Sequence, residues 1–249
     1  MGTEKLPELA YLYSPRHSCI FIGTTGLMLL LAVLGFGNSF FLRPLSDLSP
    51  LRPSVFFHGL IMTAWFIGIF FQAILIDKGK FKAHHLLGWF LVCIGIVVIL
   101  WSIVTTLNFV PGRLASGTDI EARLSFFSAI VWADFAAVIS FAIFFTIAVI
   151  KRKHVEIHIP MMIYASISIL EPALFRLWGR DIFGGLDRHL LSLAALLLLS
   201  LILVVYEYIS VQKIQTITAS AVILLLGFRI IAIYVISDSD FGISLIRSL

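Results

Sequence analysis

Charged side chains are scarce in this chain of 249 residues. Asp, Glu, Lys and Arg together make up 13% of it, which is about half the usual share in a soluble domain. Apolar residues make up 60%, and the mean hydropathy is +1.04. So few charges cannot cover the surface of a water-soluble particle of this size. The sequence therefore predicts an integral membrane protein whose main solvent is the lipid bilayer.

Several motifs that carry known chemistry are also missing. The only two cysteines, Cys19 and Cys93, lie in apolar segments and form no disulfide framework, and no CxxCH motif for covalent haem occurs. No lysine lies inside an apolar segment, which excludes a retinal protein. Without a P-loop, GxGxxG or GxSxG motif, nucleotide-driven transport and serine hydrolysis have no support. The net charge of +4 comes from short basic runs between apolar segments, so nucleic acid is not an expected partner.

Seven apolar stretches are long enough to cross about 30 Å of hydrocarbon, which takes about 20 helical residues. Each must be helical, because lipid cannot satisfy the backbone of an isolated strand. We therefore expect an all-α bundle of seven transmembrane helices, with residues 1–249 forming one domain. The first stretch has no small-residue cleavage site behind it, so we expect it to be retained. The seven stretches are Cys19–Phe41, Ser54–Ile76, His84–Leu107, Leu124–Ile150, Pro160–Trp178, His189–Ile209 and Thr216–Ser237.

The lysines indicate how the bundle is oriented. If the N-terminus and the second, fourth and sixth connections lie on one side, every lysine falls on that side. The lysines there form dense runs, Lys78/Lys80/Lys82 and Lys151/Arg152/Lys153, directly beside apolar segments. Such runs mark the cytoplasmic side, so we expect the N-terminus inside and the C-terminus outside.

Three ionisable residues are expected deep inside the spans: Asp134, Glu171 and Arg229. Each costs on the order of 2.5–3.5 kcal/mol at a helix centre, so none should face lipid alone. Counting along the helices at about 1.5 Å per residue places all three near the midplane, which predicts a buried ion-pair cluster. The cluster either locks helices together or serves as a proton or ion relay or a charged-ligand site. Pro172 favours function, because its missing N–H releases the carbonyl of Ser168 and should kink the helix.

Four histidines are expected at two levels of the membrane. His58 and His189 lie near one face, and His84 and His158 near the lysine-rich face. A b-type haem needs one imidazole from each of two facing helices at matching depth, so each level is a candidate haem site. His58, His84 and His158 are alternatively metal ligands, although no HxxxH or ExxH motif lies on a span. Pro160 predicts that the fifth helix begins there and leaves His158 at the surface, where histidines are also common as plain interfacial residues.

A pattern of histidines and short basic runs extends from His58 to about Arg176. Its residues are His58, Gln72, Lys78-Gly79-Lys80, His84-His85-Leu86-Leu87-Gly88-Trp89, Lys151-Arg152-Lys153, His158 and Glu171-Pro172-Ala173-Leu174-Phe175-Arg176. In this pattern the chain resembles a family of uncharacterised bacterial polytopic membrane proteins, which contain a domain of unknown function. This resemblance implies a bacterial inner membrane, but it implies no activity. The distribution of histidines over helices at two levels is also similar, in architecture alone, to membrane haem proteins of the cytochrome b561 type.

Three functions are compatible with these features. The first is a redox protein that binds b-type haem through paired histidines and passes electrons across or within the bilayer, with a quinone or another membrane redox protein as partner. The second is a proton- or ion-coupled transporter or channel built on Asp134, Glu171 and Arg229. The third is an accessory or assembly subunit without chemistry of its own, in which the histidines and the charge cluster are structural.

Overall fold

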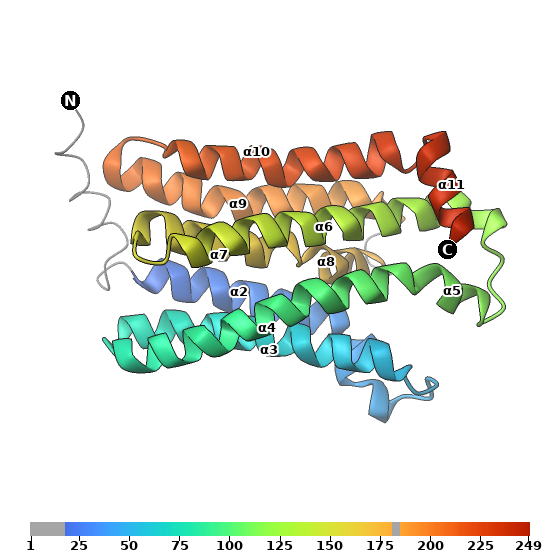
Figure 1. Cartoon of the computed structure of the whole chain (residues 1–249), viewed down its shortest axis with the longest axis horizontal. Helices are drawn as coiled ribbons and strands as arrows, with labels where there is room; N and C mark the ends of the chain where they lie inside the picture. Colours follow the sequence, from blue (N-terminus) through green and yellow to red (C-terminus); the bar gives the residue numbers. More distant parts are fainter. Residues whose placement is uncertain (1–17, 181–184) are drawn as a thin grey trace.

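The computed structural model describes residues 18–180 and 185–249, and within these residues the chain is helical and contains no strand. The long helices run antiparallel to their neighbours and form one elongated bundle (Figure 1). The helices are α2 (Ser18–Phe36), α3 (Pro53–Asp77), α4 (Phe81–Leu107), α5 (Phe109–Leu114), α6 (Leu124–Ile150), α7 (Val155–Ser168), α8 (Glu171–Trp178), α9 (Arg188–Val211), α10 (Thr216–Ile231) and α11 (Asp240–Ser248). Shorter turns are η2 (Gly37–Phe41), η3 (Arg43–Leu45), η4 (Glu121–Arg123) and η6 (Ala232–Ile236).

The prediction of an all-α membrane protein is confirmed. Six helices are long and apolar enough to cross a bilayer, and α7 with α8 gives a seventh span if that bent pair is counted as one. Connections 78–80, 151–154 and 212–215 lie at one end of the bundle, which we call the lysine end (Figure 1). Connections 42–52 and 108–123, together with residues 179–180 and 185–187, lie at the other end, which we call the arginine end. Which end faces the cytoplasm stays a prediction.

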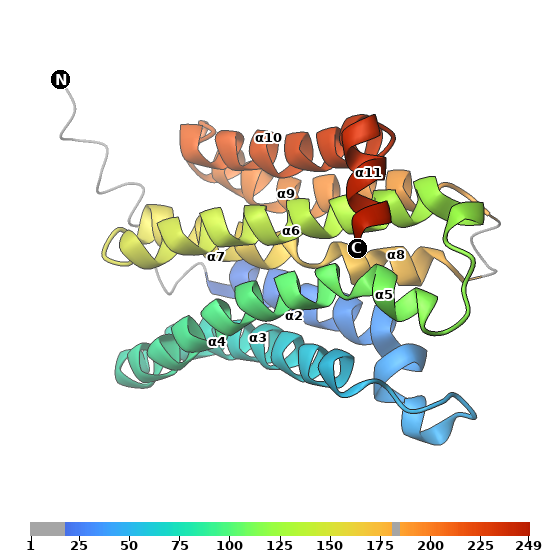
Figure 2. The ribbon, with the colours of Figure 1, turned by 45° about the vertical axis from the view of Figure 1, so that its right-hand side comes forward.

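Two groups of helices make up the bundle. Helices α2, α3 and α4 form one group and α6, α7, α9 and α10 the other (Figures 1 and 2), and α8 packs against α2 and α9. The core between the groups is aromatic: Trp65 of α3 contacts Phe141 and Phe145 of α6, with ring centroids 5.0 and 5.7 Å apart. The Trp65 indole also donates a hydrogen bond to Ser166 of α7, which satisfies its buried N–H.

Glycine allows a close helix contact near α8. A Cβ atom added at Gly35 of α2 would lie 2.2 Å from the carbonyl oxygen of Ala173 in α8. Because that obstacle is backbone, no side-chain rotation can relieve it. The next residue, Phe36, faces Arg176, whose guanidinium carbon lies 4.6 Å from the ring centroid. Gly35 therefore fixes how closely α8 packs against α2.

The fifth predicted span differs from the expectation at its start and agrees at its kink. Helix α7 begins at Val155, so Pro160 lies inside the helix and His158 in its early turns, half-buried. The prediction that this helix begins at Pro160 is therefore wrong. The kink predicted beside Pro172 is confirmed: the helix breaks after Ser168, and α8 restarts at Glu171 with a bend of 41°. Proline is well tolerated at the start of a helix, which is where Pro172 lies.

Candidate charge centre

Arg229 forms an ion pair with Glu171, one of the two acids predicted to cluster with it, and we call this pair and the side chains around it the charge centre. Glu171 is the first residue of α8, where the exposed N–H groups of a helix start favour a negative charge. The Arg229 guanidinium, from α10, contacts this carboxylate directly. The Arg229 side chain is 0% exposed and that of Glu171 is 4% exposed, so both charges are removed from solvent. A buried pair of this kind depends on additional hydrogen bonds to balance the cost of dehydration.

Two backbone carbonyls supply those hydrogen bonds. Arg229 donates to the carbonyl oxygen of Ala133 in α6 and to that of Ser168 at the end of α7. The Ser168 carbonyl is the group that Pro172 leaves without its usual helical donor. Arg229 thus joins α6, α7, α8 and α10 at one point. Its Nε atom is buried and has no hydrogen-bond partner in the described part of the chain.

His189 belongs to this centre, which the sequence did not reveal. Its Nδ1 atom lies 3.9 Å from Oε1 of Glu171, and its ring centroid lies 4.7 Å from that of Phe175 in α8. Both ring nitrogens are buried without a hydrogen-bond partner among residues 18–180 and 185–249. Asp187 caps the start of α9, because its carboxylate accepts hydrogen bonds from the backbone N–H groups of His189 and Leu190. This cap fixes the first turn of α9, which carries His189 next to Glu171.

Asp134 is the third member of the predicted cluster and has no direct partner. It follows Ala133 in α6 and lies within electrostatic range of Glu171, Arg176, Arg229 and His189. Among the described residues it makes no ion pair and no side-chain hydrogen bond. The cluster therefore contains one locked pair, Glu171 and Arg229, and one half-buried carboxylate that remains unpaired beside it.

The histidines at the arginine end are engaged with different groups. Nδ1 of His58 in α3 lies 3.5 Å from the hydroxyl of Thr105 in α4. His58 is also within electrostatic range of Arg176. His189 instead contacts Glu171 and Phe175. No contact between His58 and His189 is present in the described residues, so a haem between them stays a prediction.

The histidines at the lysine end come from α4 and α7. His84 and His158 lie within electrostatic range of each other. Nδ1 of His158 is 2.9 Å from the carbonyl oxygen of Ala148, which leaves Nε2 of this ring for another partner. Nδ1 of His84 is buried and unpaired within the part of the chain that the structure describes. Gln72 holds this turn of α4 by donating to the His84 carbonyl, with a distance of 3.1 Å.

The candidate metal ligands His58, His84 and His158 do not lie in one group. Within the described residues there is no cluster of three or more His, Cys, Asp or Glu side chains that could hold a metal ion. His58 lies toward the arginine end, whereas His84 and His158 lie at the lysine end. The sequence predicted that His58 lies near one face of the membrane and that His84 and His158 lie near the other, and the structure has the same separation.

Glu207 is a buried acid that the sequence analysis missed. It is 0% exposed on α9, near the lysine end. Its carboxylate accepts from the Thr218 hydroxyl at 2.6 Å and from the Gln215 backbone N–H at 3.1 Å. These bonds cap α10 and join it to α9. Glu207 was overlooked because it lies only two residues from the predicted end of its span.

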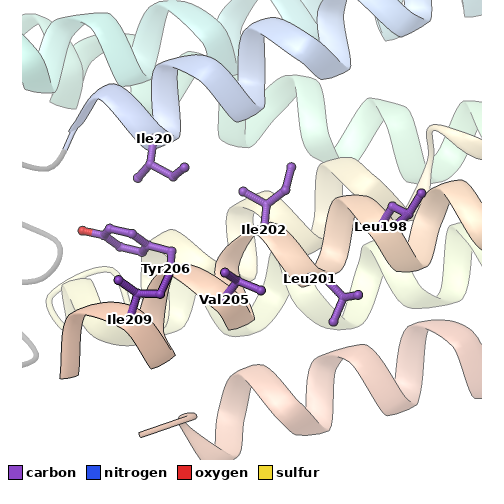
Figure 3. A pocket seen from close by; sticks show the side chains of 7 residues that line it. All are labelled: Ile20, Leu198, Leu201, Ile202, Val205, Tyr206 and Ile209. Carbon is purple, nitrogen blue, oxygen red and sulfur yellow. The ribbon is translucent and has the colours of Figure 1, made fainter. Parts of the chain in front are cut away.

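An apolar groove runs along the outside of the bundle between α2 and α9 (Figure 3). Ile20 faces Ile202 and Tyr206 across it, and aliphatic side chains form the rest of its wall. Such a surface suits a lipid chain and lies outside the charge centre. The lining residues are Ile20, Leu198, Leu201, Ile202, Val205, Tyr206 and Ile209.

Comparison with known proteins adds no assignment. No family model, curated protein or solved structure matches this chain. The candidate sites therefore rest on the residues and the geometry described above.

Proposed function

We propose that this protein is a proton-coupled membrane transporter whose proton-binding centre is Glu171 with Arg229 and His189. The observation that supports this most directly is the buried Glu171–Arg229 pair at the break between α7 and α8. Broken helices with exposed backbone ends at membrane depth are typical of ion- and substrate-binding sites in transporters. An ionisable residue buried in a membrane bundle is a candidate functional group for the same reason.

The contacts of Arg229 allow Glu171 to change its protonation state. When Glu171 takes up a proton, Arg229 loses its carboxylate partner but keeps the carbonyls of Ala133 and Ser168. The positive charge of Arg229 is then balanced mainly by Asp134, the remaining carboxylate within electrostatic range, which has no ion-pair partner in the described residues. His189 lies beside Glu171, neither of its ring nitrogens makes a hydrogen bond in the described residues, and it can pass a proton to or from the carboxylate.

A purely structural ion pair is the main competing explanation. A structural lock explains why Arg229 contacts four helices. It does not explain why both ring nitrogens of His189 are buried without a hydrogen bond in the described residues, because buried polar groups without hydrogen bonds are costly. These groups are expected in a centre that exchanges protons with water.

The test is proton uptake by the purified full chain in liposomes that contain a pH-sensitive dye. The outside is made acidic, a potassium ionophore clamps the potential, and chloride and phosphate are supplied. We expect uptake above that of empty liposomes, and Glu171→Gln should reduce it to the empty level. Glu156→Gln is the matched control, because the ion pair of Glu156 in the described residues is with His154, near the lysine end and away from Glu171. Unchanged uptake in Glu171→Gln, or none in the wild type, would contradict the proposal.

A second candidate function is haem-based electron transfer at the lysine end. It is favoured by His84 and His158, two rings from different helices that lie in electrostatic range and each keep an unpaired nitrogen. The group would be haem b, with a quinone or a membrane redox protein as electron partner, in a bacterial inner membrane. Protein purified from haem-replete cells should then show a haem absorbance spectrum that His84→Ala removes. A colourless preparation would exclude this function.

A further inference from the structure

The lysine end of the bundle carries an excess of positive charge. Its described residues include seven basic and three acidic side chains, so four positive charges remain when the histidines are counted as neutral. The rest of the described chain has nine basic and eight acidic side chains, so the excess belongs to this end. Residues 1–17 contain two of each kind and leave the balance unchanged. The seven basic residues are Lys78, Lys80, Lys82, Lys151, Arg152, Lys153 and Lys213.

Carboxylates do not neutralise these seven cations within the described residues. All seven side chains are exposed, and the ion pairs of the described chain involve other residues. The three acids of this end have partners of their own. Asp77 accepts a hydrogen bond of 2.5 Å from Ser18 of α2. Glu156 pairs with His154 at 3.3 Å, and Glu207 is fully buried. The positive surface is therefore available to an anion.

Two of the basic runs lie next to each other on the bundle. The guanidinium carbon of Arg152 lies 5.5 Å from the centroid of the Trp89 ring in α4. This contact holds the connection between α6 and α7 against α4, whose first turn carries Lys82. Seven residues separate Lys82 from Trp89, which places both on one face of the helix. Helices α4 and α6 also pack together deeper in the bundle, where a Cβ atom added at Gly95 would lie 2.5 Å from the Phe145 ring.

An exposed apolar surface continues from these charges along α4 toward the centre of the bundle. Leu86, Trp89 and Phe90 are 77%, 59% and 62% exposed. At about 1.5 Å per residue, Phe90 lies roughly 12 Å deeper than Lys82. Phospholipids have the same order of groups, with a charged phosphate outside and acyl chains inside, and tryptophan is common at the level where the two meet. A soluble acidic partner would cover the charges but leave the apolar surface bare.

We propose that Lys82, Trp89 and Arg152 form a binding site for one anionic phospholipid, whose acyl chains lie along the outer face of α4. One terminal nitrogen of Arg152 donates to the Val149 carbonyl at 3.4 Å, and the other N–H groups have no partner in the described residues. A guanidinium held over an aromatic ring can bind the lipid phosphate with two parallel hydrogen bonds. The neighbouring lysines raise the local potential, and clustered basic residues beside a membrane span attract anionic headgroups in this way.

The lipid site is independent of the proposed proton transport. It uses the outer surface of α4 and the connection between α6 and α7, whereas the charge centre is built from α6, α7, α8, α9 and α10. A bound lipid bridges α4 and this connection, so it should stabilise the contact between the two groups of helices.

The experiment measures which lipid the purified full chain retains. The protein is equilibrated in neutral detergent with equal amounts of phosphatidylglycerol and phosphatidylcholine that have the same acyl chains, and native mass spectrometry counts the bound lipids. We expect phosphatidylglycerol to be retained in preference to phosphatidylcholine. Because each basic residue near an anionic membrane surface contributes roughly five-fold in affinity, Arg152→Gln should lower this preference about five-fold. Equal retention of the two lipids by the wild type overturns the proposal.

Two variants separate a defined site from general attraction by surface charge. Lys213→Gln removes the same charge at the same end, on the opposite side of α6 and α7 from α4 (Figures 1 and 2), and should keep the wild-type preference. Trp89→Leu keeps the net charge and an apolar side chain but removes the ring that holds Arg152, and should weaken the preference. An equal loss in Lys213→Gln and Arg152→Gln, or an unchanged preference in Trp89→Leu, overturns the site.

An acidic protein is the other occupant that the charges allow. Polyglutamate added to the same detergent solution serves as the probe for this alternative. Arg152-dependent binding of polyglutamate without enrichment of phosphatidylglycerol assigns the surface to an acidic protein and overturns the lipid site. Enrichment of phosphatidylglycerol that depends on Arg152 and Trp89 supports the lipid site, whether or not the chain takes up protons in liposomes.

Discussion

Arg229 of α10 donates a hydrogen bond to the carbonyl oxygen of Ser168, the group that the break before Pro172 frees from the helical hydrogen-bond pattern. The arginine thus compensates for the break while it holds the carboxylate of Glu171. A broken helix and a buried charge are each costly in a membrane. Here the free carbonyl at the break accepts a hydrogen bond from the buried arginine, which lowers both costs. The arrangement fixes where the proton-binding carboxylate lies.

Removing Arg229 should strongly destabilise the fold. Arg229→Met leaves Glu171 as a buried carboxylate without its cation, which costs about 3–5 kcal/mol for a buried pair. The thermal unfolding midpoint in detergent should fall accordingly. The double variant Glu171→Gln/Arg229→Met should recover much of the loss, because no charge is then left unpaired. A double variant as unstable as Arg229→Met would show that the ion pair is not the source of the effect.

The surface ion pair offers a contrasting case. Arg247 of α11 donates two hydrogen bonds of 3.1 Å to Glu121, and both side chains are largely exposed. Exposed pairs contribute little because water and salt screen them. Arg247→Met should therefore leave the unfolding midpoint nearly unchanged in the same assay. A loss as large as that of Arg229→Met would contradict the importance assigned to burial.

Helix packing at Gly35 should be sensitive to a single methyl group. In Gly35→Ala the new Cβ meets the Ala173 backbone, so α2 and α8 must separate, and overpacking of this kind costs about 1–3 kcal/mol. Because α8 carries Glu171, proton uptake should fall together with the unfolding midpoint. Gly23→Ala in the same helix is the control, since its added Cβ has no atom within 4 Å. Equal behaviour of the two variants would refute the close contact.

We expect His189 to contribute to proton uptake through its ring nitrogens and not through the packing of its ring. His189→Phe keeps an aromatic ring against Phe175 but removes both nitrogens beside Glu171. We expect a folded protein with slower proton uptake in the liposome assay. His154→Phe provides a matched control, because His154 is exposed near the lysine end and contacts Glu156. If both variants take up protons at the wild-type rate, His189 has no part in proton transfer.

Pro172 should be needed for the freed carbonyl. In Pro172→Ala the restored N–H can bond to the Ser168 carbonyl in a regular helix and compete with Arg229. Hydrogen exchange should show a protected amide at position 172, and proton uptake should slow. A fast-exchanging amide with normal uptake would indicate that the bend is maintained by packing alone.

The sequence predicted the parts of this structure that depend on hydropathy and depth. The long apolar runs predicted the bounds of the long helices to within a few residues. Counting residues along the helices also placed Glu171 and Arg229 at the same depth, where they form an ion pair. Proline chemistry gave the break beside Glu171. Pro160 gave a wrong helix start, because α7 begins at Val155 and carries Pro160 inside the helix, where its missing N–H leaves the Glu156 carbonyl without the usual helical donor.

The lateral arrangement of the helices was beyond these arguments. Counting along a helix gives depth but not which neighbour a side chain meets, so His189 was paired with His58 rather than with Glu171. The start of α7 at Val155 also moves Glu171 away from the lysine end, to the level of the first turn of α9. Arg176 was expected only as the end of a family-like segment, since nothing in the sequence indicates that it lies within electrostatic range of Asp134.

The central claim is that Glu171 takes up and releases a proton, and infrared difference spectroscopy of the purified protein tests it most directly. Spectra recorded between pH 8 and pH 5 should show the carbonyl stretch of a protonated carboxylic acid appear as the pH falls. The account predicts that Glu171→Gln removes a defined part of this band, whereas Glu156→Gln leaves that part in place. A wild-type band that Glu171→Gln does not change would show that Glu171 stays ionised, as a structural lock would require.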